Sequence, residues 1–359
     1  MTDLNVEIYD MKLKNPVMPA AGPPIRNGEV AHKAKEGGAG AIVTKTISTE
    51  AADVPRPCMA EVDTGFLNSE LWSEHGPNVW LDAEYPEVKK TGLPIIVGLG
   101  YSGEDIRELA PKVEPYADAL ELSTHYLGGD PSPVIEAIEA AKESVDIPVF
   151  VKLSPDVDIS KFAKAAEDAG ADGIVLINSF GPCLDIDLET GEPLMGSKDG
   201  YGWLSGDAIF PLALRCVFEA CGAVDIPVIG VGGISSGADA IKMIMAGAQA
   251  VQVCTAAILE GPQVYGKIVA EMENILEEKG YSSLDEIRGL AQQKVDDKVN
   301  LNKEVPKAND ECTTCGICKK SCPYQAITIE EKALIDEESC FGCGLCVTRC
   351  PVNALKIDY

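Results

Sequence analysis

Two copies of one cysteine pattern end the chain, CTTCGICKKSCP at residues 312–323 and CFGCGLCVTRCP at residues 340–351. Both read C-x2-C-x2-C-x3-C-P, and they also match between the cysteines, where Cys-Gly-Ile-Cys answers Cys-Gly-Leu-Cys. Such a match indicates a short internal repeat. Zinc knuckles would account for paired C-x2-C units but not for the further cysteines or the prolines. The pattern therefore favours iron–sulfur clusters over zinc.

The spacing is that of bacterial two-cluster ferredoxins, in which three cysteines of a run hold one 4Fe-4S cluster and the fourth ligates the other. We expect two clusters, one held by Cys312, Cys315, Cys318 and Cys350 and one by Cys340, Cys343, Cys346 and Cys322. A pair of clusters carries electrons and does no chemistry on an organic substrate. The preceding residues should therefore contain an electron acceptor and its reaction.

Charge and cysteine use restrict the partners and the compartment. The formal net charge of -27 disfavours nucleic acid and membrane as partners, and it suits a protein that meets a basic patch on a redox partner. The N-terminus shows no signal segment, and the apolar run 243–259 is too short and too polar to span a membrane. Five of the 13 cysteines lie outside the cluster pattern without any pairing pattern. We therefore expect a reducing, low-oxygen cytoplasm.

Eight short β-rich apolar runs alternate with helical stretches, at 16–22, 39–47, 94–100, 119–124, 148–154, 173–179, 227–233 and 250–256. Clear helical candidates are 133–144, 160–170, 208–222 and 236–247. Alternation of strands with helices implies parallel pairing, and eight units predict a closed (β/α)8 TIM barrel. The fold class is thus α/β, with the barrel at 1–295, a linker at 296–310 and a small ferredoxin-like α+β domain at 311–359. The connections 48–93 and 180–207 are too long for turns, and both leave the face where barrel enzymes place their chemistry.

Two glycine patterns predict different things. The segment Gly98-Leu99-Gly100-Tyr101-Ser102-Gly103 matches the dinucleotide fingerprint, but in a barrel it marks the exit of the third strand, so we expect no NAD(P)H site there. Gly232-Gly233 and Cys254-Thr255 end the last two strands, where barrels bind phosphate through loop amides and a helix N-terminus, and Ser205-Gly206 precedes another helix. The phosphate of flavin mononucleotide (FMN) fits this pattern. The alternative is that the glycines serve only tight turns.

Polar residues end several of the other strands: Lys45, Ser123, Thr124, Lys152, Asn178 and Ser179. A lysine that ends an apolar strand loses its hydration at a cost in free energy, unless an anionic or polar group pairs with it and offsets that cost. Reduced flavin is an anion at its pyrimidine end, and a lysine beside it would stabilise the reduced form.

The barrel resembles the dihydroorotate dehydrogenase superfamily of FMN enzymes at Ala20-Ala21-Gly22, Thr44-Lys45-Thr46, Val151-Lys152-Leu153, Ile177-Asn178-Ser179, Gly232-Gly233-Ile234 and Cys254-Thr255. The segments 66–74, 204–209 and 251–254 are similar to the pyrimidine half of dihydropyrimidine dehydrogenase, which also carries a two-cluster ferredoxin domain. The resemblance does not extend to the NADPH and FAD domains of that family, and we expect this chain to lack them. The resemblance therefore implies that electrons come from ferredoxin or from an NAD(P)H-oxidising flavoprotein subunit. We also expect a homodimer.

The resemblance and the strand-end pattern together predict the site residues. The expected cofactor contacts are Ala20, Ala21, Gly22, Lys45, Thr46, Lys152, Asn178, Ser205, Gly206, Gly232, Gly233, Cys254 and Thr255. The expected substrate contacts are Asn68, Glu70, His75, Glu121, Ser123, Tyr126, Asn178 and Ser179.

The chain departs from the family in the loop after the fourth strand. Where the family reads Asn-Leu-Ser-Cys-Pro, this sequence reads Glu121-Leu122-Ser123-Thr124-His125, so Thr124 replaces the acid/base cysteine. A hydroxyl is too weak an acid to act unaided, and we expect His125 or His75 to reprotonate Thr124, with Tyr126 as a further candidate. The expected catalytic residues are Thr124, His125 and Lys45. An ionised Glu121 only accepts hydrogen bonds, which predicts weak pyrimidine turnover and a substrate that presents N–H groups or positive charge. The alternative is that Glu121 turns away and pairs with a lysine.

The expected function is an FMN- and iron–sulfur-dependent oxidoreductase acting on CH–CH bonds. Electrons would pass through two 4Fe-4S clusters to FMN and on as hydride to an activated C=C bond of a small cyclic or conjugated substrate. One alternative is an electron-transfer subunit with flavin as a relay. Another is a genuine dihydropyrimidine or dihydroorotate dehydrogenase subunit. Reduction of tRNA uridine on a similar barrel is opposed by the negative charge.

Overall fold

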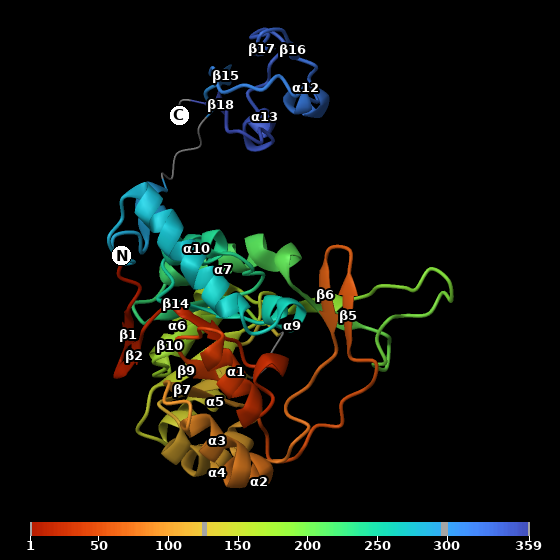
Figure 1. Cartoon of the computed structure of the whole chain (residues 1–359). Helices are drawn as coiled ribbons and strands as arrows, with labels where there is room; N and C mark the ends of the chain where they lie inside the picture. The colour runs from red at the N-terminus through yellow and green to blue at the C-terminus, as the bar shows by residue number, and fades with distance from the viewer. Residues whose placement is uncertain (1, 124–127, 296–300, 358–359) are drawn as a thin grey trace. The chain divides into compact units, whose positions relative to one another are not determined.

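The structure is a computed structural model that describes residues 2–123, 128–295 and 301–357 (Figure 1). The chain divides into two compact units, Met1–Val295 and Asp296–Tyr359.

The first unit is built on eight parallel strands in the order β3-β14-β13-β10-β9-β8-β7-β4. These are β3 (Val17–Pro19), β4 (Ile42–Val43), β7 (Ile95–Leu99), β8 (Ala119–Ser123), β9 (Val149–Leu153), β10 (Gly173–Leu176), β13 (Val228–Val231) and β14 (Ala250–Val253). The amide of Gly40 donates to the carbonyl of Val17 at 2.8 Å, which joins the two ends of the sheet. Each strand falls within one of the eight predicted runs, and the predicted TIM barrel is confirmed.

Helices cover the outside of the barrel, and the strands are buried on both faces, which is why they read as continuous apolar runs. The longer helices are α1 (Gly28–Glu36), α4 (Gly103–Val113), α5 (Ser132–Lys142), α6 (Ile159–Asp168), α7 (Phe210–Cys221), α8 (Gly237–Ala246) and α10 (Val264–Lys279). Shorter ones are α2 (Pro77–Val79), α3 (Tyr85–Lys89), α9 (Thr255–Glu260) and α11 (Leu290–Lys294). The four helices predicted most clearly are confirmed as α5, α6, α7 and α8.

An N-terminal hairpin of β1 (Val6–Ile8) and β2 (Met11–Leu13) was not predicted. Its side chains alternate between buried and exposed, so one face packs on the barrel core and the other meets solvent. That alternation was its signal in the sequence.

The two long connections pair with each other. They contain β5 (Met59–Val62), β6 (Gly65–Asn68), β11 (Phe180–Cys183) and β12 (Gly202–Ser205), which form an antiparallel sheet in the order β11-β12-β6-β5. We call this the cover sheet. In Figure 1, β5 and β6 stand to the right of the barrel beside the green segment that follows β10. Sequence analysis predicted the length of both connections but not the sheet, because the pairing joins residues as far apart as Asn68 and Trp203.

The second unit is small and repeats itself. Helices α12 (Ile317–Ser321) and α13 (Leu345–Thr348) each follow a glycine, at Gly316 and Gly344, and each carries the third cysteine of its run. Two antiparallel pairs complete the unit: β15 (Lys307–Ala308) with β18 (Leu355–Lys356), and β16 (Ile327–Ile329) with β17 (Ala333–Ile335). These two helices and two strand pairs agree with the predicted small ferredoxin-like α+β domain.

Candidate active site

A cavity of about 280 Å³ opens at the carboxyl ends of the barrel strands. All the residues predicted to contact the cofactor line it: Ala20, Ala21, Gly22, Lys45, Thr46, Lys152, Asn178, Ser205, Gly206, Gly232, Gly233, Cys254 and Thr255. Of the predicted substrate contacts, the lining includes Asn68, Glu70, Ser123, Asn178 and Ser179. The barrel and the cover sheet thus bring most of the predicted site together.

Two glycine loops meet at one end of this cavity. Gly206 and Gly233 both have positive φ, 83° and 70°. A Cβ at Gly233 would lie 2.7 Å from the backbone nitrogen of Phe210 and 2.8 Å from the carbonyl oxygen of Gly206, so no larger residue fits there. Beside the loops, the hydroxyls of Ser205 and Thr255 lie 2.8 Å apart. Side-chain-free backbone next to two hydroxyls is an arrangement that suits a phosphate group.

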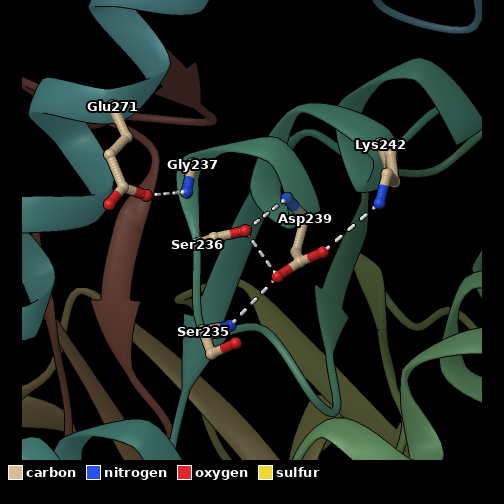
Figure 2. Close-up of polar contacts among 6 residues, drawn as sticks. All are labelled: Ser235, Ser236, Gly237, Asp239, Lys242 and Glu271. Carbon is tan, nitrogen blue, oxygen red and sulfur yellow. Dashed lines mark hydrogen bonds and ion pairs between the residues drawn. The ribbon is translucent and has the colours of Figure 1, made fainter. Parts of the chain in front are cut away.

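The N-terminus of α8, which follows β13, is already occupied by the chain's own carboxylates (Figure 2). Glu271 accepts from the amide of Gly237 at 2.7 Å. Asp239 accepts from the Ser236 hydroxyl at 2.7 Å, and its own amide donates back to that hydroxyl at 3.2 Å. A phosphate placed there would meet two like charges. The glycine loops are therefore the better candidate for phosphate.

Two buried lysines face the cavity, each held by carboxylates. The Lys45 ammonium lies 2.9 Å from Glu70 and 3.3 Å from Glu74, and its side chain is only 3% exposed. Burial acts to raise the pKa of Glu74, but backbone hydrogen bonding and the Lys45 charge outweigh it and lower that pKa, so Glu74 is ionised at neutral pH. The Lys152 ammonium lies 3.6 Å from Glu121.

Glu121 does not line the cavity. Its side chain is fully buried, and it accepts a hydrogen bond of 2.5 Å from the side-chain amide of Gln252. The expectation that its carboxylate faces the substrate is therefore corrected, because the carboxylate lies one layer deeper in the barrel. The arrangement corresponds to the alternative in which Glu121 turns away and pairs with a lysine.

His75 is also outside the cavity. It is exposed to solvent and absent from the lining. This corrects the expectation that it contacts the substrate or reprotonates an acid there. The predicted residues Thr124, His125 and Tyr126 lie outside the described residues.

The cavity wall also contains a group of mostly aromatic residues that were not predicted from the sequence: Met59, Phe66, Trp72, Tyr101, Trp203 and Gln252. The Trp72 and Tyr101 rings lie 5.2 Å apart. Burial raises the pKa of Tyr101 to about 12, so its phenol keeps its proton near neutral pH. Phe66 and Trp203 come from the cover sheet, so only the pairing of the two connections brings them here. Tyr101 directly follows the glycine pattern that resembled a dinucleotide site.

The cavity fits FMN on two observations. The glycine loops and the hydroxyls of Ser205 and Thr255 suit a phosphate group. The side-chain oxygen of Gln252 is buried and has no hydrogen-bond donor among the described residues. A buried acceptor of this kind calls for a partner, and a ring with an N–H group, such as the pyrimidine end of flavin, would supply it.

The cluster cysteines surround two separate hollows in the second unit. One is lined by Cys312, Cys315, Cys318 and Cys350, and the other by Cys340, Cys343, Cys346 and Cys322. Each set is the one expected from the spacing, with the fourth cysteine of one run joining the other run. Among the described residues, no group of three or more His, Cys, Asp or Glu side chains is gathered as a single metal ion would require.

The remaining cysteines do not form disulfides: all 13 lie in the described part of the chain and all are free. Burial raises the pKa of the Cys254 thiol, in the cavity wall, to about 11, so it stays protonated at neutral pH. Within the described ranges, none of the helices has the length and apolar character needed to cross a membrane.

Comparison with known proteins agrees with this architecture. The dihydroorotate dehydrogenase family model matches residues 3–276, and a 4Fe-4S dicluster domain model matches residues 311–354. Relatives include the dihydroorotate dehydrogenase B (NAD(+)) catalytic subunits of Methanothermobacter thermautotrophicus and Methanosarcina mazei. The first is 38% identical over 301 residues, covering 80% of this chain and 98% of that protein. The second is 40% identical over 301 residues, covering 79% of this chain and 94% of that protein.

These relatives do not confirm the resemblance to the dihydropyrimidine dehydrogenase branch. The chain belongs to the dihydroorotate dehydrogenase family of oxidoreductases and carries a 4Fe-4S ferredoxin domain after its barrel.

Proposed function

We propose that the protein is an FMN-dependent oxidoreductase that interconverts a CH–CH and a C=C bond in a small cyclic substrate and exchanges electrons through two 4Fe-4S clusters. The observation that carries this proposal is the cavity in which the glycine loops, two buried lysines and the unpartnered Gln252 oxygen meet. FMN, when bound, links clusters that carry single electrons to a bond that changes by two.

Different residues of the chain would hold the phosphate, the ring and the substrate. The loops at Gly206 and Gly233, with the hydroxyls of Ser205 and Thr255, would hold the phosphate. Lys152 and Gln252 would lie at the ring. Amides and hydroxyls of Asn68, Asn178 and Ser179 remain to orient the substrate.

The balance of the reaction requires an acid in the protein. Saturating a C=C bond takes two electrons and two protons, of which one proton arrives with the electron pair as hydride. The second proton comes from a protein group, and Thr124 stays our prediction for the residue that contacts the substrate there.

The relatives favour dihydroorotate and orotate as the substrate pair over other pyrimidines. Their names describe catalytic subunits of an NAD(+)-linked enzyme. By analogy, we propose that a separate subunit that handles NAD(+), or a ferredoxin, exchanges electrons with the clusters of this chain.

One observation favours a different ring, without a carboxylate. Lys45 is one of the two lysines that line the cavity, and Glu70 and Glu74 already neutralise it. A substrate carboxylate added to this group would leave three negative charges against one positive charge. The second candidate is therefore an uncharged ring of the dihydrouracil type. Because Glu121 lies outside the cavity, its carboxylate does not disfavour a pyrimidine ring there.

An anaerobic titration distinguishes the candidates. Oxidised protein is mixed with dihydroorotate or, separately, with dihydrouracil, and flavin absorbance is followed; reduced protein is mixed with orotate or uracil. Flavin that responds to the dihydroorotate pair supports the first candidate, and a response to the dihydrouracil pair alone supports the second. Flavin that responds only to protein partners contradicts the proposal and supports the relay alternative.

The Glu74→Gln variant sharpens this test, because Glu74 is 38% exposed and does not line the cavity. Removing one charge beside Lys45 should lower the KM for dihydroorotate by about two- to fivefold, the range of a partly exposed ion pair. The KM for dihydrouracil is the internal control and should not change.

A further inference from the structure

A buried ion pair reaches from the cavity wall into the barrel interior. Lys152 lines the cavity, and Glu121 lies behind it at 3.6 Å, with side chains only 6% and 0% exposed. Gln252, on the opposite side of the barrel, lines the cavity and donates to the same carboxylate at 2.5 Å. Glu121 therefore connects two residues that face the proposed position of the flavin ring.

The carboxylate changes what Lys152 can do electrostatically. A single buried ammonium would attract negative charge in the cavity strongly, because little water is present to screen it. With a carboxylate at 3.6 Å the pair is neutral overall, and the field of such a pair falls off faster with distance than that of a single charge. Any group in the cavity that gains negative charge therefore receives less stabilisation.

The oxygens around the ion pair add to this effect. The Glu121 carboxylate oxygen that faces the Lys152 ammonium and the side-chain oxygen of Gln252 are both buried without a hydrogen-bond donor among the described residues. The Gln252 oxygen therefore adds a negative partial charge to the cavity wall without a donor to offset it. The local surroundings of the cavity floor are thus poor in positive charge despite the lysine.

We propose that Glu121 is a positioning residue that offsets the charge of Lys152 and so lowers the reduction potential of the flavin in the cavity. The inference rests on the proposed binding of FMN. Reduced FMN carries more negative charge than oxidised FMN, so a floor without net positive charge disfavours the reduced form. A lower potential favours transfer of the electron pair from flavin to substrate, which is the reductive direction of the proposed reaction.

The rival interpretation is that Glu121 only holds Gln252 in place. A glutamine at position 121 has nearly the same volume and can still accept the hydrogen bond from Gln252, but it has no charge. Glu121→Gln therefore separates the electrostatic role from the structural one. The matched control is Glu108→Gln, which removes a carboxylate that pairs with Lys112 at 2.9 Å on the exposed surface of α4.

The experiment is an anaerobic redox titration of the flavin in the cluster-loaded protein. In Glu121→Gln, the equilibrium between oxidised and two-electron-reduced flavin should shift toward the reduced form by at least about tenfold, or about 30 mV for a two-electron couple. Glu108→Gln should titrate like the wild type. The cluster potentials are a further control and should not change in either variant.

An unchanged flavin potential in folded, flavin-loaded Glu121→Gln would overturn the proposal. If this variant does not fold or loses its flavin, the flavin potential of the wild-type protein tests the proposal instead. A flavin potential at or below that of free FMN supports the inference, and one well above it overturns the inference, since an unopposed lysine would have that effect. Wild-type protein that binds no flavin would instead contradict the proposed function.

Discussion

The floor of the cavity and its cover differ in how well the sequence predicts their residues. On the floor, made by the ends of the barrel strands and the glycine loops, every predicted cofactor residue lines the cavity. On the substrate side, His75 and Glu121 do not line it, and the indole rings of Trp72 and Trp203 were missed. Most floor residues directly follow barrel strands whose order places them, whereas Trp203 on the cover, and also Ser205 at the end of β12, depend on pairing between connections that are far apart in the sequence. A site held by local backbone is thus easier to predict than one held by distant side chains.

The cysteines of the cluster domain lie even closer together in the sequence than the floor residues. Changing one of them should have the largest effect on electron transfer. Cys340→Ala removes a ligand from one hollow, so iron should fall from about eight per chain to about four, the content of one cluster. Flavin reduction by a protein electron donor should slow by more than about a hundredfold, because the electron path is broken. Iron analysis and stopped-flow absorbance measure both.

Direct reduction of the flavin by dithionite should survive this change. Cys183→Ala, at a cysteine of the cover sheet outside both hollows, is the control and should retain all iron. An iron content of four or less in fully loaded wild type would contradict the two-cluster assignment.

The substrate side of the cavity is tested by substitution of the predicted proton donor. Thr124→Ala should slow substrate-dependent flavin reoxidation by about a hundredfold, the usual scale of acid catalysis, and leave flavin reduction through the clusters unchanged. His75→Ala should have no effect on either rate, because His75 is exposed and outside the cavity. Single-turnover kinetics separate the two steps. If both variants slowed flavin reoxidation equally, His75 would take part in the reaction despite its position outside the cavity.

The floor itself is tested by Gly233→Ala, for which we expect a smaller effect than for Cys340→Ala or Thr124→Ala. The new Cβ would collide with the backbone of Phe210 and Gly206, so the loops must separate, and FMN affinity should fall by about tenfold or more. Gly280→Ala is the matched control, since Gly280 also has positive φ but has open space around it. Both variants should lower the Tm through left-handed strain of about 1–2 kcal/mol. Equal FMN affinity in the two would argue that the glycines serve only tight turns.

Local patterns in the chain were enough for the barrel and for most of the floor. Eight apolar runs set the strand order, because parallel strands joined by helices can close in few ways. Gly233 marked its loop because a Cβ there would collide with the backbone of Phe210 and Gly206, and Gly206 marked its loop because its backbone has positive φ. The cysteine spacing also predicted which four cysteines meet at each hollow, since a repeated unit places its fourth cysteine beside its partner's three.

Depth within the barrel was decided only by the tertiary structure. Glu121 and Ser123 are two residues apart on β8, so both point to the barrel interior, yet only Ser123 lines the cavity. Ser123 ends the strand at the rim, and Glu121 belongs to the layer below, where it meets Lys152 and a glutamine 131 residues away. Strand periodicity specifies the face of a side chain but not its layer, because the layer depends on how far each strand extends relative to its neighbours.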